Sequence, residues 1–489
     1  MSLILFQILI ALSIFNMRRT HKIVYFFSFL IFSGGGVFGQ NYYRTKQHPS
    51  STRSGNEVAP VITREGMVFC SDKETGGIQK RRGKDGQRIS NIYFSALTED
   101  GKWENDKVFS VQLKTDHHDG PISFNFNEDL AVFTRNFELP GFGSKKGGNP
   151  NFGLFFSEYV GNRWSNITEF EYNNRDYHTT HPALSPMGDL LYFASDMPDG
   201  FGGYDIYVSS NQNGRWSKPV NLGPVVNTSD NEIYPSLHSS GRLYFSSDGH
   251  DRRGDYDIFY TDLFQGKWFK PVKLGSPFNS GLDDFTFYTD ENYATGMFTS
   301  NRKGSLDIWT FESILPEFDF CKKQAEDNFC YIFFEENTVS LDTNLYMYEW
   351  NMGDGDKIRA KEAEHCYANP GDFLVELNVV DRLTGIVEFN QAEYLIEVRK
   401  VIQPFITSVD TSLINQELQI HGIESYLGEA KVGEYYWDFG DGVKATGATV
   451  RHTYLSPGSF TIKLGIIEEG NNIETVQQFC SYKTIVIKE

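Results

Sequence analysis

Histidine and aspartate residues gather in two short segments, and these residue types are common ligands of transition metals. Both segments connect the last strand of one repeated unit to the first strand of the next, in the repeat described below. They would meet if those units surround a common axis. The alternative is a pair of solvated polar loops, so no metal site is assigned. The residues concerned are His117, His118 and Asp119 in the first segment and Asp176, His178 and His181 in the second.

An aspartate-rich segment at residues 248–257 offers the carboxylate oxygens that calcium prefers. Its sequence, DGHDRRGDYD, does not have the spacing of an EF-hand loop. The last aspartate, Asp257, recurs in the repeated motif as Asp205 and Asp307, which favours a structural role in a turn or strand. We therefore predict no cofactor, with bound calcium as the alternative.

Two glycine-rich loops carry locally basic residues in an otherwise acidic chain. Because loops on a rigid scaffold often carry function, we regard these residues as candidates for partner binding. The alternative is that both loops are solvated insertions. The basic residues are Lys80, Arg81, Arg82, Lys84 and Arg88 in the first loop and Lys145 and Lys146 in the second.

The common catalytic motifs are missing from the sequence. There is no Gly-x-Ser-x-Gly elbow, no His-Glu-x-x-His, no Walker loop and no Rossmann glycine pattern. The chain has 64 acidic and 45 basic side chains, which gives a net charge of −19. Such a balance argues against a nucleic-acid partner, because phosphate binding needs Lys and Arg surfaces. We therefore expect a protein that is not an enzyme and does not bind nucleic acid.

A repeated strand pattern organises the first half of the chain and would position these residues. The repeated segments are VFCSD, VFTRN, YFASD, YFSSD and MFTSN, with phenylalanines at Phe69, Phe133, Phe193, Phe245 and Phe298. A second strand follows each segment, and an extended run such as HPALSPMG precedes it. Four of the repeats add a strand that contains tryptophan. Four short strands per unit predict the blades of a β-propeller.

We predict an all-β chain in which residues 58–314 form a propeller of five blades, with six blades as the alternative. The fifth blade lacks its tryptophan strand, so residues 40–57 are expected to supply a strand and close the ring. The motifs resemble the WD-like propeller repeats of exported bacterial proteins, including the TolB propeller.

The second half of the chain contains two copies of one pattern, 87 residues apart. Each copy has a strand ending in tryptophan, a Gly-Asp-Gly turn, a His-x-Tyr strand and a Pro-Gly turn. The pattern residues are Trp350, Asp354 and His365 in the first copy and Trp437, Asp441 and His452 in the second. The pattern closely resembles the PKD (polycystic kidney disease) domain family. This resemblance implies immunoglobulin-like sandwiches at residues 315–400 and 401–489.

Within each copy we interpret the tryptophan as a core residue and the aspartate as a turn cap. The histidine is expected to form a hydrogen bond inside the module, with metal binding as the alternative. The first copy departs from the pattern at Asn351 and Met352, where the second has Asp438 and Phe439.

The first 39 residues have the layout of a signal peptide. A basic stretch follows Met17, the expected translation start, and precedes an apolar stretch at residues 23–32. A transmembrane hairpin is the alternative, but we do not expect a membrane-spanning protein. The five cysteines permit at most two disulfides in an exported chain. Cys330 and Cys366 could pair or remain as buried thiols.

The negative charge lies mainly on the two PKD-like modules, because residues 316–489 hold 29 acidic and 14 basic side chains. Such modules would favour a basic partner surface. A propeller joined to PKD-like modules resembles accessory proteins of Bacteroidetes-type envelopes, where this combination accompanies type IX secretion and gliding machinery.

That resemblance implies a non-enzymatic periplasmic scaffold for protein–protein interaction, held at the outer membrane by its partners. The expected partner is an envelope complex such as an outer-membrane translocon, which the protein could gate or plug. The chain ends on the last strand of the second module, so we expect a resident component rather than a secreted cargo. The alternatives are a glycan-binding envelope protein and a metal-dependent hydrolase at the propeller face.

Overall fold

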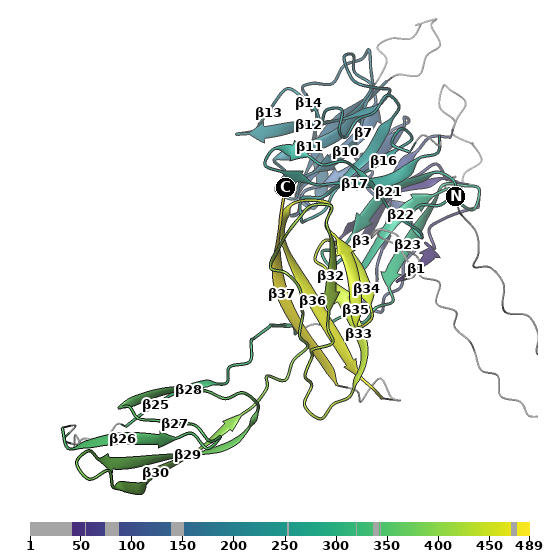
Figure 1. The fold of residues 1–489 in the computed structure, drawn as a ribbon. Coiled ribbons are helices and arrows are strands. Elements are labelled where there is room, and N and C mark those ends of the chain that lie inside the picture. Colours follow the sequence, from purple (N-terminus) through teal and green to yellow (C-terminus); the bar gives the residue numbers. More distant parts are fainter. Residues whose placement is uncertain are drawn as a thin grey trace, which may run out of the picture. The chain divides into compact units, whose positions relative to one another are not determined.

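The computed structural model describes thirty-seven β-strands and, within the described residues, no α-helix (Figure 1). In this part of the chain no helix meets the length and apolar character that a membrane span needs. The predicted signal peptide and the basic residues Lys80, Arg81, Arg82, Lys84, Lys145 and Lys146 lie outside the described residues. The described residues are 42–53, 55–73, 88–137, 151–251, 254–318, 320–335, 342, 344–470 and 477–489.

Five antiparallel sheets follow one another along the first half of the chain, and each is one blade. The first blade contains β2 (Glu57–Thr63), β3 (Gly66–Ser71), β4 (Asn91–Ala96) and β5 (Lys107–Val108). The second contains β6 (Asp119–Phe124), β7 (Leu130–Asn136), β8 (Phe152–Val160) and β9 (Arg163–Glu169). The third contains β10 (Thr179–Leu184), β11 (Leu190–Ser195), β12 (Asp205–Gln212), β13 (Arg215–Trp216) and β14 (Val220–Asn221).

The fourth and fifth blades complete the propeller. The fourth contains β15 (Glu232–Leu237), β16 (Leu243–Ser247), β17 (Asp257–Thr261) and β20 (Val272–Lys273), with a short hairpin of β18 (Leu263–Phe264) and β19 (Lys267–Trp268). The fifth contains β21 (Asp284–Thr289), β22 (Thr295–Ser300), β23 (Asp307–Ser313) and the N-terminal strand β1 (Tyr43–Gln47). β1 pairs antiparallel with β23, so a segment from the start of the chain forms the outer strand of the last blade.

The core of the propeller consists of apolar layers between neighbouring blades. The five repeated phenylalanines, Phe69, Phe133, Phe193, Phe245 and Phe298, are all fully buried in these layers. One layer joins Phe69 of the first blade to Met297 and Ile308 of the fifth, so the packing continues around the ring. Burying each such ring contributes roughly 1.5–3 kcal/mol. The prediction of an all-β, five-bladed propeller is confirmed.

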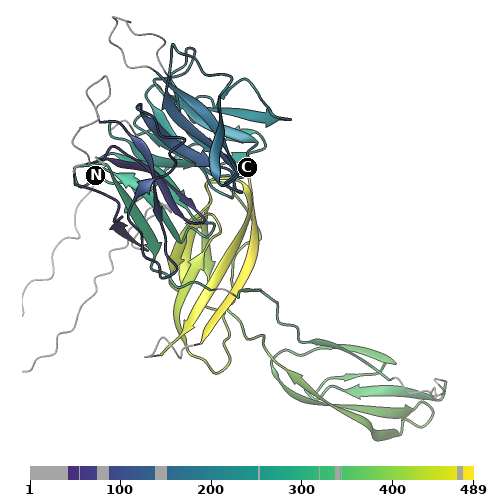
Figure 2. The same cartoon turned by 180° about the vertical axis from the view of Figure 1, so that it is seen from behind.

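Each of the two following modules is a sandwich of two sheets (Figures 1 and 2). The first module pairs β25 (Cys330–Phe334) with β28 (Glu362–Cys366), and its other sheet contains β27 (Lys357–Ile358), β26 (Tyr346–Asn351), β29 (Gly371–Asp381) and β30 (Val387–Val398). The second pairs β32 (Glu417–His421) with β35 (Thr449–Thr453), and its other sheet contains β34 (Lys444–Thr446), β33 (Val432–Asp438), β36 (Gly458–Glu468) and β37 (Gln478–Lys488).

Both sandwiches are built around their pattern tryptophan, as two immunoglobulin-like modules require. Trp350 and Trp437 are fully buried. The Nε1–H of Trp350 donates to the Ala360 carbonyl at 3.1 Å, and that of Trp437 donates to the Gly447 carbonyl at 2.8 Å. A disulfide joins Cys330 to Cys366 across the smaller sheet of the first module. Cys70 is a free, buried thiol.

The segment between the propeller and the first module belongs structurally to the second module. We expected residues 315–400 to form one unit, but β24 (Lys322–Lys323) pairs in parallel with β37 of the second module. A second disulfide, Cys321–Cys480, joins the same two segments. The Phe318 ring lies where a side chain at Gly465 would stand, since a Cβ there would be 2.2 Å from the ring. The first strand of the first module is therefore β25, which begins at Cys330.

Candidate functional site

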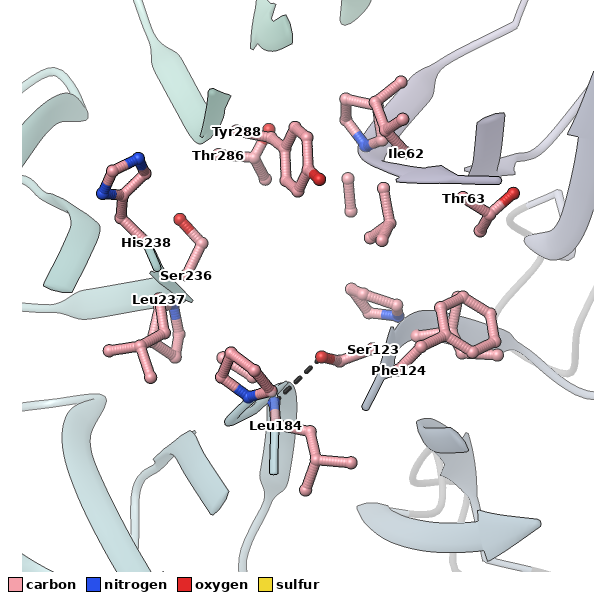
Figure 3. A pocket seen from close by; sticks show the side chains of 18 of the residues that line it. Ile62, Thr63, Ser123, Phe124, Leu184, Ser236, Leu237, His238, Thr286 and Tyr288 are labelled. Carbon is pink, nitrogen blue, oxygen red and sulfur yellow. Dashed lines mark hydrogen bonds between the residues drawn. The ribbon is translucent and has the colours of Figure 1, made fainter. Parts of the chain in front are cut away.

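The innermost strands of the five blades enclose a pocket of about 470 Å³ on the propeller axis (Figure 3). Its wall is formed by β2, β6, β10, β15 and β21. Each of these strands contains an irregularity in its register with the next strand of its blade. At each irregularity one residue has a left-handed backbone, and these residues are Ala59, Gly120, His181, Tyr234 and Thr286.

These bulges explain the shape of the pocket wall. A bulge bends a strand and redirects its side chains, here beside the axis. In four strands the left-handed residue is followed by proline, namely Pro60, Pro121, Pro182 and Pro235. Proline suits a bulge because it has no N–H to leave unpaired. The x-Pro pairs inside the predicted extended runs were the available sequence signal for these bulges, which the sequence analysis did not predict.

The pocket presents hydroxyl groups between apolar walls. Figure 3 shows Ser123, Ser236 and Tyr288 among side chains such as Phe124 and Leu184. Ser123 Oγ accepts the Leu184 N–H at 2.9 Å, and Ser236 Oγ donates to the Phe287 carbonyl at 2.5 Å. This lining is suited to holding an apolar or hydroxylated ligand.

His181, one of the predicted metal candidates, lies in this wall. Its ring packs against that of Tyr234, with 3.9 Å between the ring centroids and an angle of 34° between the ring planes. Burial lowers the pKa of His181 to about 3, so the imidazole is neutral at physiological pH. Its Nδ1 has no hydrogen-bond partner within the described residues.

His118 and His178 hold neighbouring blades together. His118 Nδ1 accepts the Ser90 N–H of the preceding blade at 3.2 Å, and His178 Nδ1 accepts the Phe152 N–H at 3.1 Å. The equivalent positions in the other blades make the same bond with an amide or carboxylate oxygen. Asn231 accepts from Tyr204, Asp283 accepts from Tyr256, and Asn56 accepts from Leu306 of the fifth blade. We call this set of five bonds the blade latch.

Two of the predicted metal candidates, His118 and His178, take part in the blade latch at separate places. His117 is not part of the latch, and its own N–H donates to Thr115 Oγ1 at 3.1 Å. Of the described residues, a group of three metal-type ligand atoms within 4.8 Å of one another occurs at Asp354, Asp356 and His365, and the propeller histidines form no such group. In the described part of the propeller, the predicted metal candidates therefore do not come together as the ligand set that a metal-dependent hydrolase would need.

A lysine of β20, Lys273, places its ammonium between two carboxylates of the aspartate-rich segment. Lys273 Nζ lies 2.5 Å from a carboxylate oxygen of Asp251 and 2.5 Å from one of Asp257. Burial raises the pKa of Asp257 to about 6, although the lysine opposes that shift. A calcium ion bound by the same two carboxylates would meet the positive charge of Lys273.

The PKD pattern residues form the same hydrogen bonds in both modules. His365 Nε2 lies 2.7 Å from Asp354 Oδ2, and His452 Nε2 lies 2.9 Å from Asp441 Oδ2. Burial disfavours the charge on Asp441, but His452 and Arg242 hold the pKa of that carboxyl below its usual range. The pattern therefore fixes the Gly-Asp-Gly turn against the neighbouring strand.

The second module is joined to the propeller through this turn. The buried guanidinium of Arg242, between β15 and β16, donates to the Asp441 carbonyl at 2.6 Å and pairs with Asp262 at 2.9 Å. Ser456 Oγ also donates to Asp262, at 2.9 Å. Val443 packs against the apolar layer between the fourth and fifth blades. No sequence pattern pointed to this junction, because Arg242 and Asp441 are 199 residues apart.

Two stretches of the chain, residues 316–390 and 403–480, match the family model of the PKD domain. The chain therefore contains two PKD domains. Human Polycystin-1 is 29% identical over 123 residues, which are 24% of this chain and 3% of that protein. Collagenase ColA of Clostridium perfringens is 30% identical over 80 residues, which are 16% of this chain and 7% of that protein. The chain thus spans only a small part of the length of these relatives.

The solved structures to which this chain is similar share little sequence with it. A glycoside hydrolase is similar over 59% of this chain and 96% of its own length, with 10% identity and a TM-score of 0.39. Trypanosoma rangeli sialidase is similar over 91% of this chain and 88% of its own length, with 8% identity and a TM-score of 0.31. Similarity at this level carries no information about activity.

Proposed function

We propose that the protein is a non-enzymatic interaction scaffold in which the propeller and the second PKD domain form a fixed base and the first PKD domain binds a partner. The observation that carries this proposal is the unequal anchoring of two copies of one domain. The second domain is held by Arg242, by the Cys321–Cys480 disulfide and by β24. The first domain is an insertion between two segments, around Ala325 and Gln403, that are bonded to each other.

The compartment we propose is the periplasm of a bacterial envelope. Two disulfides, Cys321–Cys480 and Cys330–Cys366, support an oxidising environment, because such bonds are rare in the reducing cytosol. The signal-peptide layout of the first 39 residues supports the same location.

In its finer form the proposal is that the partner belongs to an outer-membrane secretion or gliding machine of the type IX kind. The support is the resemblance of this domain combination to the accessory proteins of such envelopes. A role in gating or plugging a translocon would be one way for such a scaffold to act.

Removal of the first PKD domain tests the proposal. Residues 326–400 can be replaced by a short glycine linker, because Ala325 N–H already donates to Gln403 Oε1 at 3.0 Å. We expect the full chain to enrich one envelope protein after cross-linking in native cells, and the shortened chain to lose it while keeping the melting temperature of the propeller. Equal recovery by both chains would contradict the proposal.

A second candidate function, glycan binding, is favoured by the axial pocket. Tyr288 and Phe124 offer aromatic faces there, and Ser123 and Ser236 offer hydroxyl groups. A sugar array probed with the full chain tests it. Binding that is lost in Tyr288→Ala would support this candidate, and an array without signal would remove it.

A further inference from the structure

The two PKD domains end in equivalent strands, β30 and β37. Gly371 of β29 pairs with Val398, and Gly458, 87 residues later, pairs with Ile487. This register makes Leu395 the equivalent of Thr484 and Glu397 the equivalent of Val486. The two strands can therefore be compared residue by residue.

In the second domain the outer edge of β37 is covered by strands of this chain. β31 (Thr411–Leu413) pairs with it in parallel, and the Val486 N–H donates to the Asp410 carbonyl at 2.9 Å. β24 pairs with the middle of β37, also in parallel, and the Gln324 N–H donates to the Tyr482 carbonyl at 2.9 Å. The backbone groups on this edge thus have partners.

The segment that would cover the equivalent edge of the first domain is bonded to the second domain instead. The residues 87 positions before β31 are Gln324–Glu326. Gln324 bonds to Tyr482 and Ile406 of the second domain, and Ala325 bonds to Gln403. β30 is the last strand of its sheet, and no strand within the described residues pairs with its outer edge (Figure 1).

The exposed edge of β30 has a distinct chemistry. The Val486 N–H points toward the covering strand, so the register directs the N–H of Glu397 toward the free edge. The side chains of Glu393, Leu395 and Glu397 are exposed, and Leu395 is 64% exposed. Arg399 lies 3.5 Å from Glu397, but it is also paired with Asp372 at 2.5 Å.

The whole first domain adds to this negative charge. Residues 326–400 hold 16 acidic and 6 basic side chains, whereas residues 401–489 hold 11 and 6. Charged residues on an edge strand usually prevent pairing between identical chains. Two copies of β30 would place glutamates against glutamates, whereas a basic strand would find complementary charges.

We propose that the free edge of β30 binds an extended segment of a partner protein, which adds to the sheet as a parallel strand with alternating basic and apolar side chains. The parallel direction follows from β31 and β24, which cover the equivalent edge of the second domain in that direction. Backbone bonds would give affinity, and contacts with Glu393, Leu395 and Glu397 would give selectivity. This proposal rests on the proposed function and specifies its binding surface.

A synthetic peptide of alternating Lys and Val, twelve residues long like β30, is the probe. We expect the full chain to bind it, and to bind neither an alternating Glu-Val peptide nor a Lys-Val peptide whose backbone nitrogens are all methylated. The methylated peptide has the same charge but has no N–H group with which to pair with an edge. A photo-reactive group on the first residue of the probe should label the Val387 end of β30. Equal binding of the methylated peptide would overturn the proposal.

Charge reversal locates the surface. Glu393→Lys with Glu397→Lys should weaken binding of the Lys-Val probe about tenfold or more. The matched control is Glu362→Lys with Glu364→Lys, which changes the net charge equally on exposed residues of β28 in the other sheet. The control should retain binding. If both pairs weaken binding equally, the probe recognises only the net charge and the edge assignment fails.

The variant Leu395→Pro separates this proposal from the proposed function. Proline removes an N–H that the register directs outward, so the strand keeps its bonds to β29. Melting temperatures equal to wild type would show that the domain is folded. If the chain without residues 326–400 loses the native partner and folded Leu395→Pro keeps it, the scaffold stands and the edge assignment fails. If the shortened chain keeps the partner, the scaffold proposal itself fails.

Discussion

The two PKD domains share a sequence pattern and differ in what surrounds them. Each buries its tryptophan and joins histidine to aspartate in the same way. In the second domain the aspartate turn meets Arg242, and the edge strand is covered by β24 and β31. In the first domain the same turn includes the exposed Asp356, and the equivalent edge has no covering strand within the described residues.

This difference shows that two copies of one domain can keep the same core while they differ in their contacts. The residues that build the sandwich are retained in both copies, whereas the residues outside the pattern decide what each copy contacts. Position 443 is an example, because Val443 packs against the propeller while its equivalent, Asp356, faces solvent. The comparison can be tested by changing such positions in pairs.

The largest expected effect comes from the two disulfides. Cys321–Cys480 closes a loop of 159 residues and Cys330–Cys366 one of 36, so removal should cost about 5 and about 4 kcal/mol by loop entropy. Replacing Cys321 and Cys480 by serine should also loosen the linker from the second domain. Calorimetry of both double variants measures the costs. A smaller effect for the 159-residue loop would contradict the anchoring role of the linker.

Removing the Arg242 side chain should have the next largest effect. Arg242→Ala leaves Asp262 without its buried partner, which typically costs about 3–5 kcal/mol. Arg399→Ala, in the exposed pair with Asp372, should cost far less, because solvent screens that pair. Chemical unfolding of both variants makes the comparison. Equal costs would show that the second domain is no more firmly joined to its surroundings than the first.

Exchanging the residue at one equivalent position between the two domains should change the free energy of unfolding less, and by different amounts in the two domains. Val443→Asp places a charge against the apolar layer of the fourth and fifth blades and should cost about 1–3 kcal/mol. Asp356→Val, at the equivalent exposed position, should stay within about 0.5 kcal/mol. Melting temperatures of the two variants suffice. A large effect of Asp356→Val would indicate that its carboxylate is structurally important.

The smallest effect concerns pH and separates the propeller from the PKD domains. Burial raises the pKa of Glu232 from 4.5 to about 7. Between these two pH values Glu232 is therefore protonated in the folded state and ionised in the unfolded state. This group therefore makes the propeller less stable as pH rises through that window. Glu232→Gln should flatten the dependence.

Asp441 should show the opposite sign. Although burial opposes its charge, His452 and Arg242 lower its pKa, so its contribution to stability is present at neutral pH and is lost in acid. Asp441→Asn should therefore lower stability at pH 7 more than at pH 3. Unfolding curves at several pH values check both variants, and slopes of the same sign would contradict this contrast.

Much of the fold could be predicted because its signals are local and repeated. The strand phenylalanines and the PKD tryptophans recur at regular spacing, and they fill the cores. The blade latch could not be predicted because its five positions hold three residue types, His, Asn and Asp, which all offer an acceptor atom but do not form one sequence pattern. Identity-based comparison of the repeats could not align them.

The contacts between distant segments could not be predicted for a different reason. The pairing of β24 with β37 and the bond from Arg242 to Asp441 join residues that no repeat relates. The Cys330–Cys366 pair was one of two predicted options because both residues lie in one module. The Cys321–Cys480 disulfide was not predicted from the sequence, because the linker that contains Cys321 was expected to belong to the first module.

Amide hydrogen exchange on the full chain tests the central claim most directly. Val486 should exchange slowly, because its N–H donates to Asp410, whereas the equivalent Glu397 should exchange quickly. Addition of the Lys-Val probe should protect Glu397 and leave Val486 unchanged. Slow exchange of Glu397 in the free chain, or no added protection with the probe bound, would contradict the claim that the first PKD domain offers a free edge for a partner strand.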